Sequence, residues 1–359
     1  MSVILAAKRS AVVPRGGAFA LLSLQELAAP VIGALLAAAE IAAAQVDEVI
    51  CANALGAGGN PARLCALAAG LPERVAGLSV DRQCAGGLDA VLLARALVDS
   101  GAAEVVIAGG VESYSRRPLR FRTMPGGKAV EYDQPPFTPW PERDPGMAEA
   151  AAGLAQRLGI TREIQDDWAV ESHRKALAAE FGDEIVAVGG VRRDAFARVL
   201  TPELVRRAKG LAGSVTVATA AVAADAAAFV LVVSDRVAAG RGMRIIGGAT
   251  LGGDPVEPGL APVAAVAAVL EKTGIVANGL QVVEVMEAYA VQAIACVQGA
   301  GLDVGRVNLS GGALARGHPI GASGAILAVR LFYELKQGFG LAAIAAAGGI
   351  GTALLVERR

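Results

Sequence analysis

A cysteine in a glycine-rich turn is the first residue whose position suggests chemistry. Cys84 lies in SVDRQCAGGLDA (79–90), a pattern that predicts an apolar strand, a sharp turn and then a helix. Gly86 and Gly87 let other backbone approach closely, and the unpaired N–H groups of a helix's first turn favour a thiolate. Cys84 is therefore a candidate nucleophile, although a cysteine in such a turn is more often a packed structural residue.

A histidine far along the chain is the candidate partner. His318 stands between Gly317 and Pro319 in GGALARGHPIGASG (311–324) and is one of two histidines. Its backbone is restricted there, and its imidazole can deprotonate a thiol that the fold brings near. The other histidine, His173, lies among charged residues of a predicted helix, so we expect it on a solvated face.

Composition limits the class of protein. The chain has 359 residues, of which 54% are hydrophobic and only 4% aromatic, so small side chains must build a large core in one or two closely packed domains. The four cysteines show no metal-ligand spacing, and no basic segment precedes an apolar core at the start. We expect a cytoplasmic protein with free thiols and no metal, in which Cys51, Cys65 and Cys296 are packing residues.

Two further classes are disfavoured. A net charge of −1 argues against nucleic acid as a partner. The longest uncharged run, 338–356, is interrupted by glycines at 348, 349 and 351. This pattern predicts a buried hairpin rather than a membrane span, so no membrane association is expected.

Alternating helix and strand patterns predict an α/β layered fold, and the second half repeats the first. The helix and strand predicted over 261–290 echo those over 24–54. The His318 turn, with the helix and strand that follow it, echoes the Cys84 turn. A duplicated unit with pseudo-twofold symmetry would bring the two turns to one cleft.

Between the copies the composition changes to Pro, Arg and other charged residues, which predicts an inserted segment. We therefore divide the chain into an N-terminal half of 1–115 and 212–238, an inserted loop domain of 116–211 and a C-terminal half of 239–359. The proline-rich segment 135–141 is expected to border the cleft.

Several motifs together resemble the thiolase family over nearly the whole chain: VDRQCAGGL (80–88), AGGVES (108–113), GITRE (159–163), EAYA (287–290) and the 311–324 segment. The resemblance implies a duplicated five-layer α-β-α-β-α fold with an inserted loop domain, a homodimer or homotetramer, and thioesters as substrates without a further cofactor. It also implies that Cys84 takes the acyl group, that His318 activates it, and that the backbone N–H groups of Cys84 and Ala347 form an oxyanion hole.

The sequence is divergent where thiolases carry out carbon–carbon chemistry. Met286 replaces an Asn that holds a water in one oxyanion hole, and Ala345 replaces a second cysteine that moves the α-proton of the substrate. A thioether holds that water poorly, and alanine transfers no proton. Met147 keeps its place in the acyl pocket, and Tyr289 replaces a Phe there.

These departures favour an acyltransferase that loads an acyl group from a thioester onto Cys84 and passes it to a non-Claisen acceptor. One alternative is a conventional acetyl-CoA acetyltransferase or 3-ketoacyl-CoA thiolase with a replaced base, for which Tyr289 is a candidate. Another is a non-catalytic scaffold or partner subunit. The donor is an acyl-CoA or an acyl carrier protein. An acidic carrier surface or the CoA phosphates would match four arginines of the inserted segment, which an ordinary solvated basic stretch explains equally well: Arg116, Arg117, Arg120 and Arg122.

Overall fold

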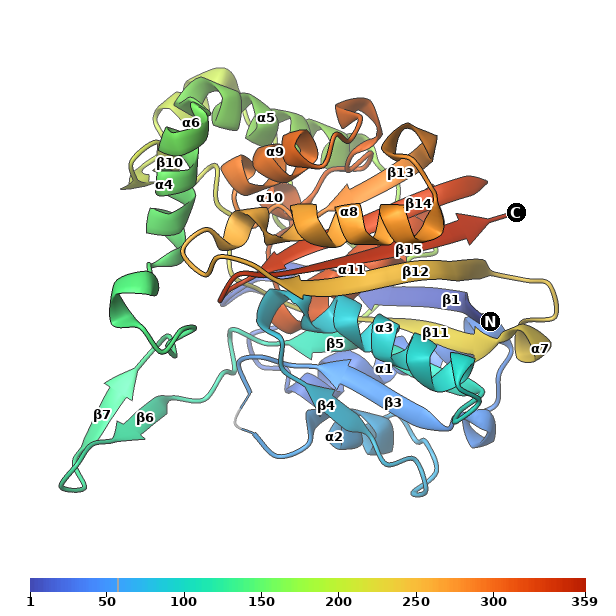
Figure 1. The fold of residues 1–359 in the computed structure, drawn as a ribbon. Coiled ribbons are helices and arrows are strands. Elements are labelled where there is room, and N and C mark those ends of the chain that lie inside the picture. The colour runs from blue at the N-terminus through green and yellow to red at the C-terminus, as the bar shows by residue number, and fades with distance from the viewer. Residues whose placement is uncertain (57) are drawn as a thin grey trace.

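A large mixed sheet organises the computed structural model, which describes residues 1–56 and 58–359 (Figure 1). The first half contributes, in spatial order, β1 (Ser2–Ser10), β11 (Ala224–Ser234), β5 (Val105–Glu112), β3 (Glu48–Ala52) and β4 (Leu78–Val80). The second half contributes β12 (Met243–Gly252), β15 (Ile350–Arg358), β14 (Gly338–Ala346) and β13 (Leu280–Val285). The short strands β2 (Val13–Pro14) and β8 (Ile185–Val186) pair with β11 and β1, and β1 joins the two arrays through β12.

The two arrays repeat the same pairing directions, as the predicted duplication requires. The pairs β3–β5 and β13–β14 are parallel, whereas β5–β11 and β14–β15 are antiparallel, as are β11–β1 and β15–β12. In the first array β3 also pairs with β4, and at the equivalent position of the second array Val283 of β13 makes a parallel bridge to Val307. The uncharged run near the C-terminus forms the predicted hairpin, β14 and β15, which a turn at 347–349 connects.

Helices form three layers around the arrays, so the predicted five-layer α/β fold is confirmed. The first array is covered by α1 (Leu24–Ala39) and α2 (Pro61–Ala68), and the second by α8 (Ala261–Thr273) and α9 (Ala290–Gly299). Between the arrays lie α3 (Gly86–Asp99) and α11 (Ile320–Glu334) (Figure 1). Side chains of β11 alternate between two cores: Val230 and Val232 pack toward α3 and α11, and Phe229 and Leu231 toward α1 and α2.

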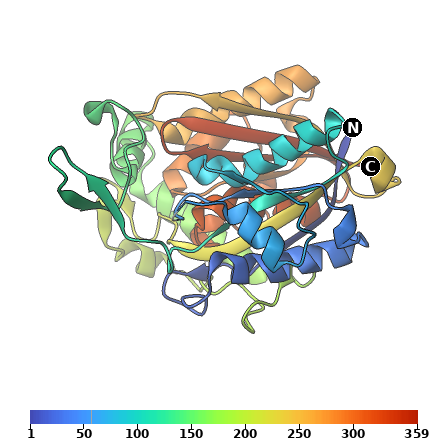
Figure 2. The same cartoon turned by 90° about the horizontal axis from the view of Figure 1, so that it is seen from below.

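The predicted inserted segment contains α4 (Met147–Leu158), α5 (Arg162–Ala178) and α6 (Pro202–Arg206), with the hairpin strands β6 (Arg120–Thr123), β7 (Ala129–Tyr132) and β9 (Gly210–Ala212). The partner of β9 is β10 (Val215–Thr216), and two short helices, α7 (Asp235–Ala238) and α10 (Ala313–Arg316), lie elsewhere. Leu154 of α4 and Ala169 of α5 share a core with Ile294 of α9. The β6–β7 hairpin stands away from the body in both views (Figures 1 and 2).

The expectation that His173 lies on a solvated face is wrong. Its side chain is 1% exposed, its Nδ1 accepts a hydrogen bond from the Arg198 N–H at 3.2 Å, and its ring packs against Phe196. Burial lowers the pKa of His173 to about 4. The buried face of α5 includes the polar residues Gln165 and Ser172, which hid its inward orientation in the hydropathy pattern.

Glycines allow the central layer to close. A Cβ at Gly87 would lie 2.7 Å from the α11 backbone, and one at Gly324 would lie 2.4 Å from the α3 backbone. A Cβ at Gly110 would lie 2.0 Å from the carbonyl oxygen of Gly321. Any side chain at these positions would separate the two halves at the level of the Cys84 and His318 turns.

The close contact of Gly110 with Gly321 predicts that a single added methyl group lowers the stability of the fold. Gly110→Ala should lower the free energy of unfolding by about 1–3 kcal/mol, the usual cost of overpacking. Gly33→Ala is the matched control because Gly33 lies in α1 with nothing within 4 Å of the added Cβ. This control should raise the free energy of unfolding by roughly 0.5–1 kcal/mol. Urea unfolding measures both, and an unchanged stability of Gly110→Ala would contradict a tight junction.

Candidate active site

The two candidate reactive side chains meet where the halves join. Cys84 Sγ lies 3.1 Å from His318 Nε2, although the residues are 234 positions apart in the chain. Cys84 belongs to the 3-10 turn Gln83–Ala85 that leads into α3, and His318 precedes the first residue of α11, Ile320. The packing of α3 against α11 therefore sets their distance.

Ser323, which the sequence reasoning did not single out, fixes the orientation of the imidazole. Its Oγ lies 2.6 Å from His318 Nδ1 and donates its own proton to the Pro319 carbonyl at 3.1 Å. Since that hydroxyl proton is engaged, Oγ accepts from Nδ1–H, which leaves Nε2 unprotonated toward the thiol of Cys84. The arrangement gives a neutral base that faces a candidate nucleophile.

Burial keeps both groups uncharged in the resting protein. It lowers the pKa of His318 to about 4 and raises the pKa of Cys84 to about 12. The backbone N–H groups of Cys84 and Ala347 lower the pKa of Cys84 and so oppose this rise. The expectation that a helix start would favour a thiolate is therefore corrected: the cost of desolvation is the larger effect.

The backbone donor at Ala347 keeps an ordinary conformation. Its φ is not positive, whereas Gly348 and Gly349 that follow take φ values of 79° and 77°. An alanine is therefore accommodated at 347 without backbone strain. Ala347 lines the same cavity as Cys84, and the role of their N–H groups as oxyanion donors stays a prediction.

A cavity of about 330 Å³ opens at the reactive pair. Its wall includes Met147, Tyr289 and Ala345, together with Pro135 and Phe137 of the segment that was expected to border the cleft. Apolar side chains therefore line much of the space in front of Cys84, as an acyl group requires.

Met286 lies behind this wall. Its side chain is 1% exposed and packs in the central core, and it is not among the residues that line the cavity. Its backbone N–H donates to the Ala343 carbonyl at 2.9 Å. Met286, which the resemblance aligns with an oxyanion-hole Asn, thus presents a buried apolar side chain.

Two phenols line the cavity, Tyr289 and a residue that the sequence reasoning missed, Tyr114. Burial raises the pKa of Tyr289 to about 12 and raises that of Tyr114 further. Both hydroxyls are therefore protonated at neutral pH and are suited to donate a hydrogen bond to a substrate oxygen. This state weakens the suggestion that Tyr289 replaces the missing base.

Glu112 is a third residue that the sequence reasoning missed, after Ser323 and Tyr114, although it lies in the AGGVES motif. It joins the end of β5, the loop after β3 and the start of α11, which begins two residues after His318. Its carboxylate accepts four hydrogen bonds: from Asn53 Nδ2 at 2.7 Å, Ala54 N at 3.0 Å, Leu55 N at 3.3 Å and Gly321 N at 3.0 Å. Burial raises the pKa of Glu112 to about 7, and the backbone donors oppose this rise.

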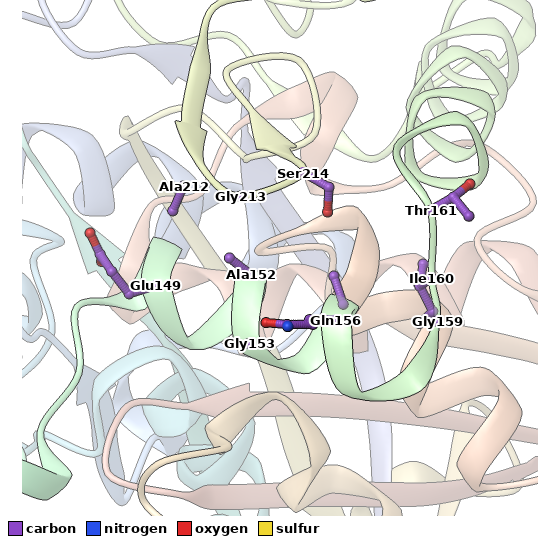
Figure 3. A pocket seen from close by; sticks show the side chains of 11 residues that line it. Glu149, Ala152, Gly153, Gln156, Gly159, Ile160, Thr161, Ala212, Gly213 and Ser214 are labelled. Atoms are coloured by element: carbon purple, nitrogen blue, oxygen red, sulfur yellow. The ribbon is translucent and has the colours of Figure 1, made fainter.

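A second hollow, of about 720 Å³, lies on the inserted segment between α4 and the 212–214 turn (Figure 3). It shares no lining residue with the cavity at Cys84. Glu149 is the one ionisable side chain among its lining residues, all of which are described, so we assign it no chemistry.

The remaining cysteines pack in the core as predicted. Cys51 and Cys65 are fully buried, and Cys296 donates to the Gly259 carbonyl at 3.0 Å. Over residues 1–56 and 58–359, no three His, Cys, Asp or Glu side chains come together as metal ligands. Within the same residues, every helix is too short or too polar to cross a bilayer.

Known proteins are similar to this chain over nearly its whole length. Family models described as "Thiolase, N-terminal domain" and "Thiolase, C-terminal domain" match residues 2–236 and 242–358. The chain is 40% identical to "Putative acetyl-CoA C-acetyltransferase YhfS" of Bacillus subtilis over 99% of both chains. It is 36% identical to "Putative acetyl-CoA C-acetyltransferase VraB" of Staphylococcus epidermidis over 99% of this chain and 98% of the relative.

Two solved structures are also similar. The acetyl-CoA acetyltransferase of Bacillus anthracis has a TM-score of 0.93 at 32% identity and covers 99% of this chain and 98% of its own. The Acat5 thiolase of Ascaris suum, solved in complex with coenzyme A, has a TM-score of 0.93 at 29% identity and covers 100% of both chains.

The neutral pair predicts how Cys84 reacts with a small alkylating agent. Because its pKa is raised to about 12, the thiolate fraction should rise roughly tenfold per pH unit from about pH 6 to 9. Alkylation by iodoacetamide, followed by mass spectrometry of the Cys84 peptide, should follow this slope. A plateau that extends below pH 7 would instead show that the Cys84–His318 pair itself reacts, either as thiolate and imidazolium or with His318 removing the thiol proton during attack.

Glu112→Gln should slow acylation of Cys84 because it disturbs the start of α11. Each carboxylate oxygen of Glu112 accepts two of the four hydrogen bonds. Whichever oxygen the NH₂ group of the glutamine replaces, two N–H donors lose their acceptor. We expect a loss of roughly ten- to a hundredfold, since a 1 Å displacement of a reacting group costs on the order of 10²-fold. The measurement is the initial rate of acyl-thioester loading, followed by intact mass.

Glu287→Gln is the matched control for loss of stability. Glu287 also accepts four hydrogen bonds, but its donors are Trp168, Ser172, Asn308 and Leu314, none of them in α3 or α11. This variant should lose comparable stability with a smaller effect on the loading rate. Equal loading rates in the two variants would show that Glu112 supports the fold without positioning His318.

Proposed function

The chain belongs to the thiolase family, and from that premise we propose that it transfers acyl groups from a thioester through a covalent acyl-cysteine intermediate on Cys84. The observation that carries the proposal is the 3.1 Å contact of Cys84 Sγ with His318 Nε2. The cavity at this pair gives a substrate access to the sulfur. A scaffold subunit would need neither feature, so the geometry favours an enzyme.

The chemistry follows from the resting state of the pair. Nε2 of neutral His318 takes the thiol proton while Sγ attacks the thioester carbonyl carbon, and the N–H groups of Cys84 and Ala347 stabilise the oxyanion. The carbon–sulfur bond to the leaving thiolate then breaks, and the imidazolium returns the proton to that thiolate. Ser323 holds Nδ1–H throughout, which keeps Nε2 as the site of proton exchange.

Two kinds of acceptor are candidates for the acyl group, a non-Claisen acceptor and a second acyl-CoA or CoA as in a conventional thiolase. Ala345 lies in the cavity wall where a proton-transferring cysteine is expected in thiolases, and this favours a non-Claisen acceptor such as an amine, hydroxyl, thiol or water. The relatives named acetyl-CoA C-acetyltransferase favour the conventional condensation or thiolysis instead. The complex of Acat5 thiolase with coenzyme A supports an acyl-CoA as the donor in both cases.

Loading and condensation can be measured separately. Acetyl-CoA should add one acetyl group to the protein, detected by intact mass, and Cys84→Ala should abolish this addition. His318→Ala should slow it about 10²- to 10⁴-fold, the range of general-base assistance. Acetoacetyl-CoA formation should be at least about 10²-fold slower than loading, and Ala345→Cys should increase it.

Condensation at the rate of loading would identify a conventional thiolase and reject the non-Claisen acceptor. An acetyl group that persists in Cys84→Ala, or the absence of any adduct with a panel of acyl thioesters, would reject Cys84 as the nucleophile.

A further inference from the structure

One part of the cavity wall is polar and positively charged. Its polar side chains come from Gln83 and from the 114–134 segment, whereas α4 and the 258–259 and 288–289 segments contribute mainly apolar ones. The charged members of the wall are Arg117, Arg120 and Asp133. An acyl group attached to Cys84 therefore lies in a cavity with a distinct basic side.

The charges in this wall do not cancel. Asp133 is the one carboxylate among the described lining residues, and its Oδ1 lies 2.6 Å from Arg117 Nη2. Arg120 Nη2 donates to the Ala54 carbonyl at 3.0 Å, which uses one of its five N–H groups. Cys84 and His318 are neutral, so among the lining residues two arginines against one aspartate leave an excess of one positive charge. The carboxylates of Glu112 and Asp81 also act on the Cys84 thiol, but they do not line the cavity.

An arginine in a mostly apolar cavity loses hydration that only an anion or several acceptors can replace. A guanidinium presents a planar fork of donors that matches a carboxylate, with two parallel hydrogen bonds. The side chain of Arg117 is 22% exposed, and its ring contact with Tyr114, at 5.8 Å from the centroid, holds it beside the cavity. The wall thus presents guanidinium donors of the kind that pair with an anionic group.

We propose that the acyl group taken by this cavity ends in a carboxylate, which Arg120 binds with help from Arg117. The proposal extends the proposed acyl transfer to a substrate class, ω-carboxyacyl thioesters. The CoA phosphates are a poorer match because the full length of the pantetheine arm separates them from the thioester. Arg117 and Arg120 line the same cavity of about 330 Å³ as Cys84, a size at the lower end of ligand pockets, roughly 300–1,000 Å³.

A binding experiment tests this without any need for catalysis. Calorimetry on the Cys84→Ala protein compares glutaryl-CoA with its half-amide, which has the same shape and no charge. We expect glutaryl-CoA to bind about ten- to a hundredfold more tightly, the range for hydrogen bonds to a charged group. Arg120→Gln should remove most of this difference.

Arg122→Gln is the matched control. Arg122 lies two residues further along β6, stacks on the Tyr132 ring at 5.3 Å and does not line the cavity, so the difference should persist. Melting temperatures of all variants verify folding. A charged-to-neutral ratio near one in the Cys84→Ala protein, or a ratio that Arg120→Gln leaves unchanged, overturns the proposal.

Two further experiments distinguish the ways in which the proposals could be wrong. The first uses thioesters of pantetheine, which carry no phosphate. Suppose that Arg120→Gln weakens the binding of glutaryl-CoA and of its half-amide equally, and has no effect on binding of the pantetheine thioesters. That result would assign the arginine to the CoA phosphates and overturn the proposal. Loading of wild-type Cys84 by glutaryl-CoA is followed by intact mass. If the carboxylate is preferred in binding but no thioester ever loads Cys84, the acyl-transfer function fails while the carboxylate site stands.

Discussion

The backbone contact between α3 and α11 is the constraint on which the rest of the structure depends. It exists because Gly87 and Gly324 leave no side chain between the helices, and because Gly110 lets β5 approach the start of α11. Each helix begins at one of the reactive turns, so the distance from Cys84 to His318 is a property of this contact. A chain with 45 glycines and 4% aromatic residues suits a fold whose central layer has large sheets on both sides.

Burial has an electrostatic consequence for the site. The thiol of Cys84 and the imidazole of His318 each keep the neutral form, since the backbone N–H groups that lower the pKa of the thiol do not offset desolvation. In the proposed mechanism the resting pair therefore holds no thiolate, and Nε2 removes the proton during attack. This step depends on the orientation that Ser323 gives the ring.

Periodicity and repetition in the sequence predicted an α/β layered fold, the duplication and the C-terminal hairpin, because hydrophobic spacing shows which face of each element is buried. The number of layers followed from the resemblance. The contact of Cys84 with His318 followed from pseudo-symmetry and from the resemblance, not from spacing. Single polar residues inside the core cannot be recognised from hydrophobic spacing. Glu112, Ser323 and His173 have buried hydrogen bonds to distant segments, and hydropathy cannot distinguish them from surface polar residues.

The functional parts of the site differ in how they tolerate substitution. A donor that belongs to the backbone, such as the N–H at Ala347, survives a change of side chain when φ stays ordinary. A proton-transferring side chain does not, and Ala345 leaves only a methyl group in the cavity wall. In the proposed mechanism, acyl loading depends on Cys84, His318 and backbone donors, whereas condensation also needs an α-proton to be removed. On this proposal, divergence at Ala345 and Met286 would affect the second half-reaction and leave the first intact.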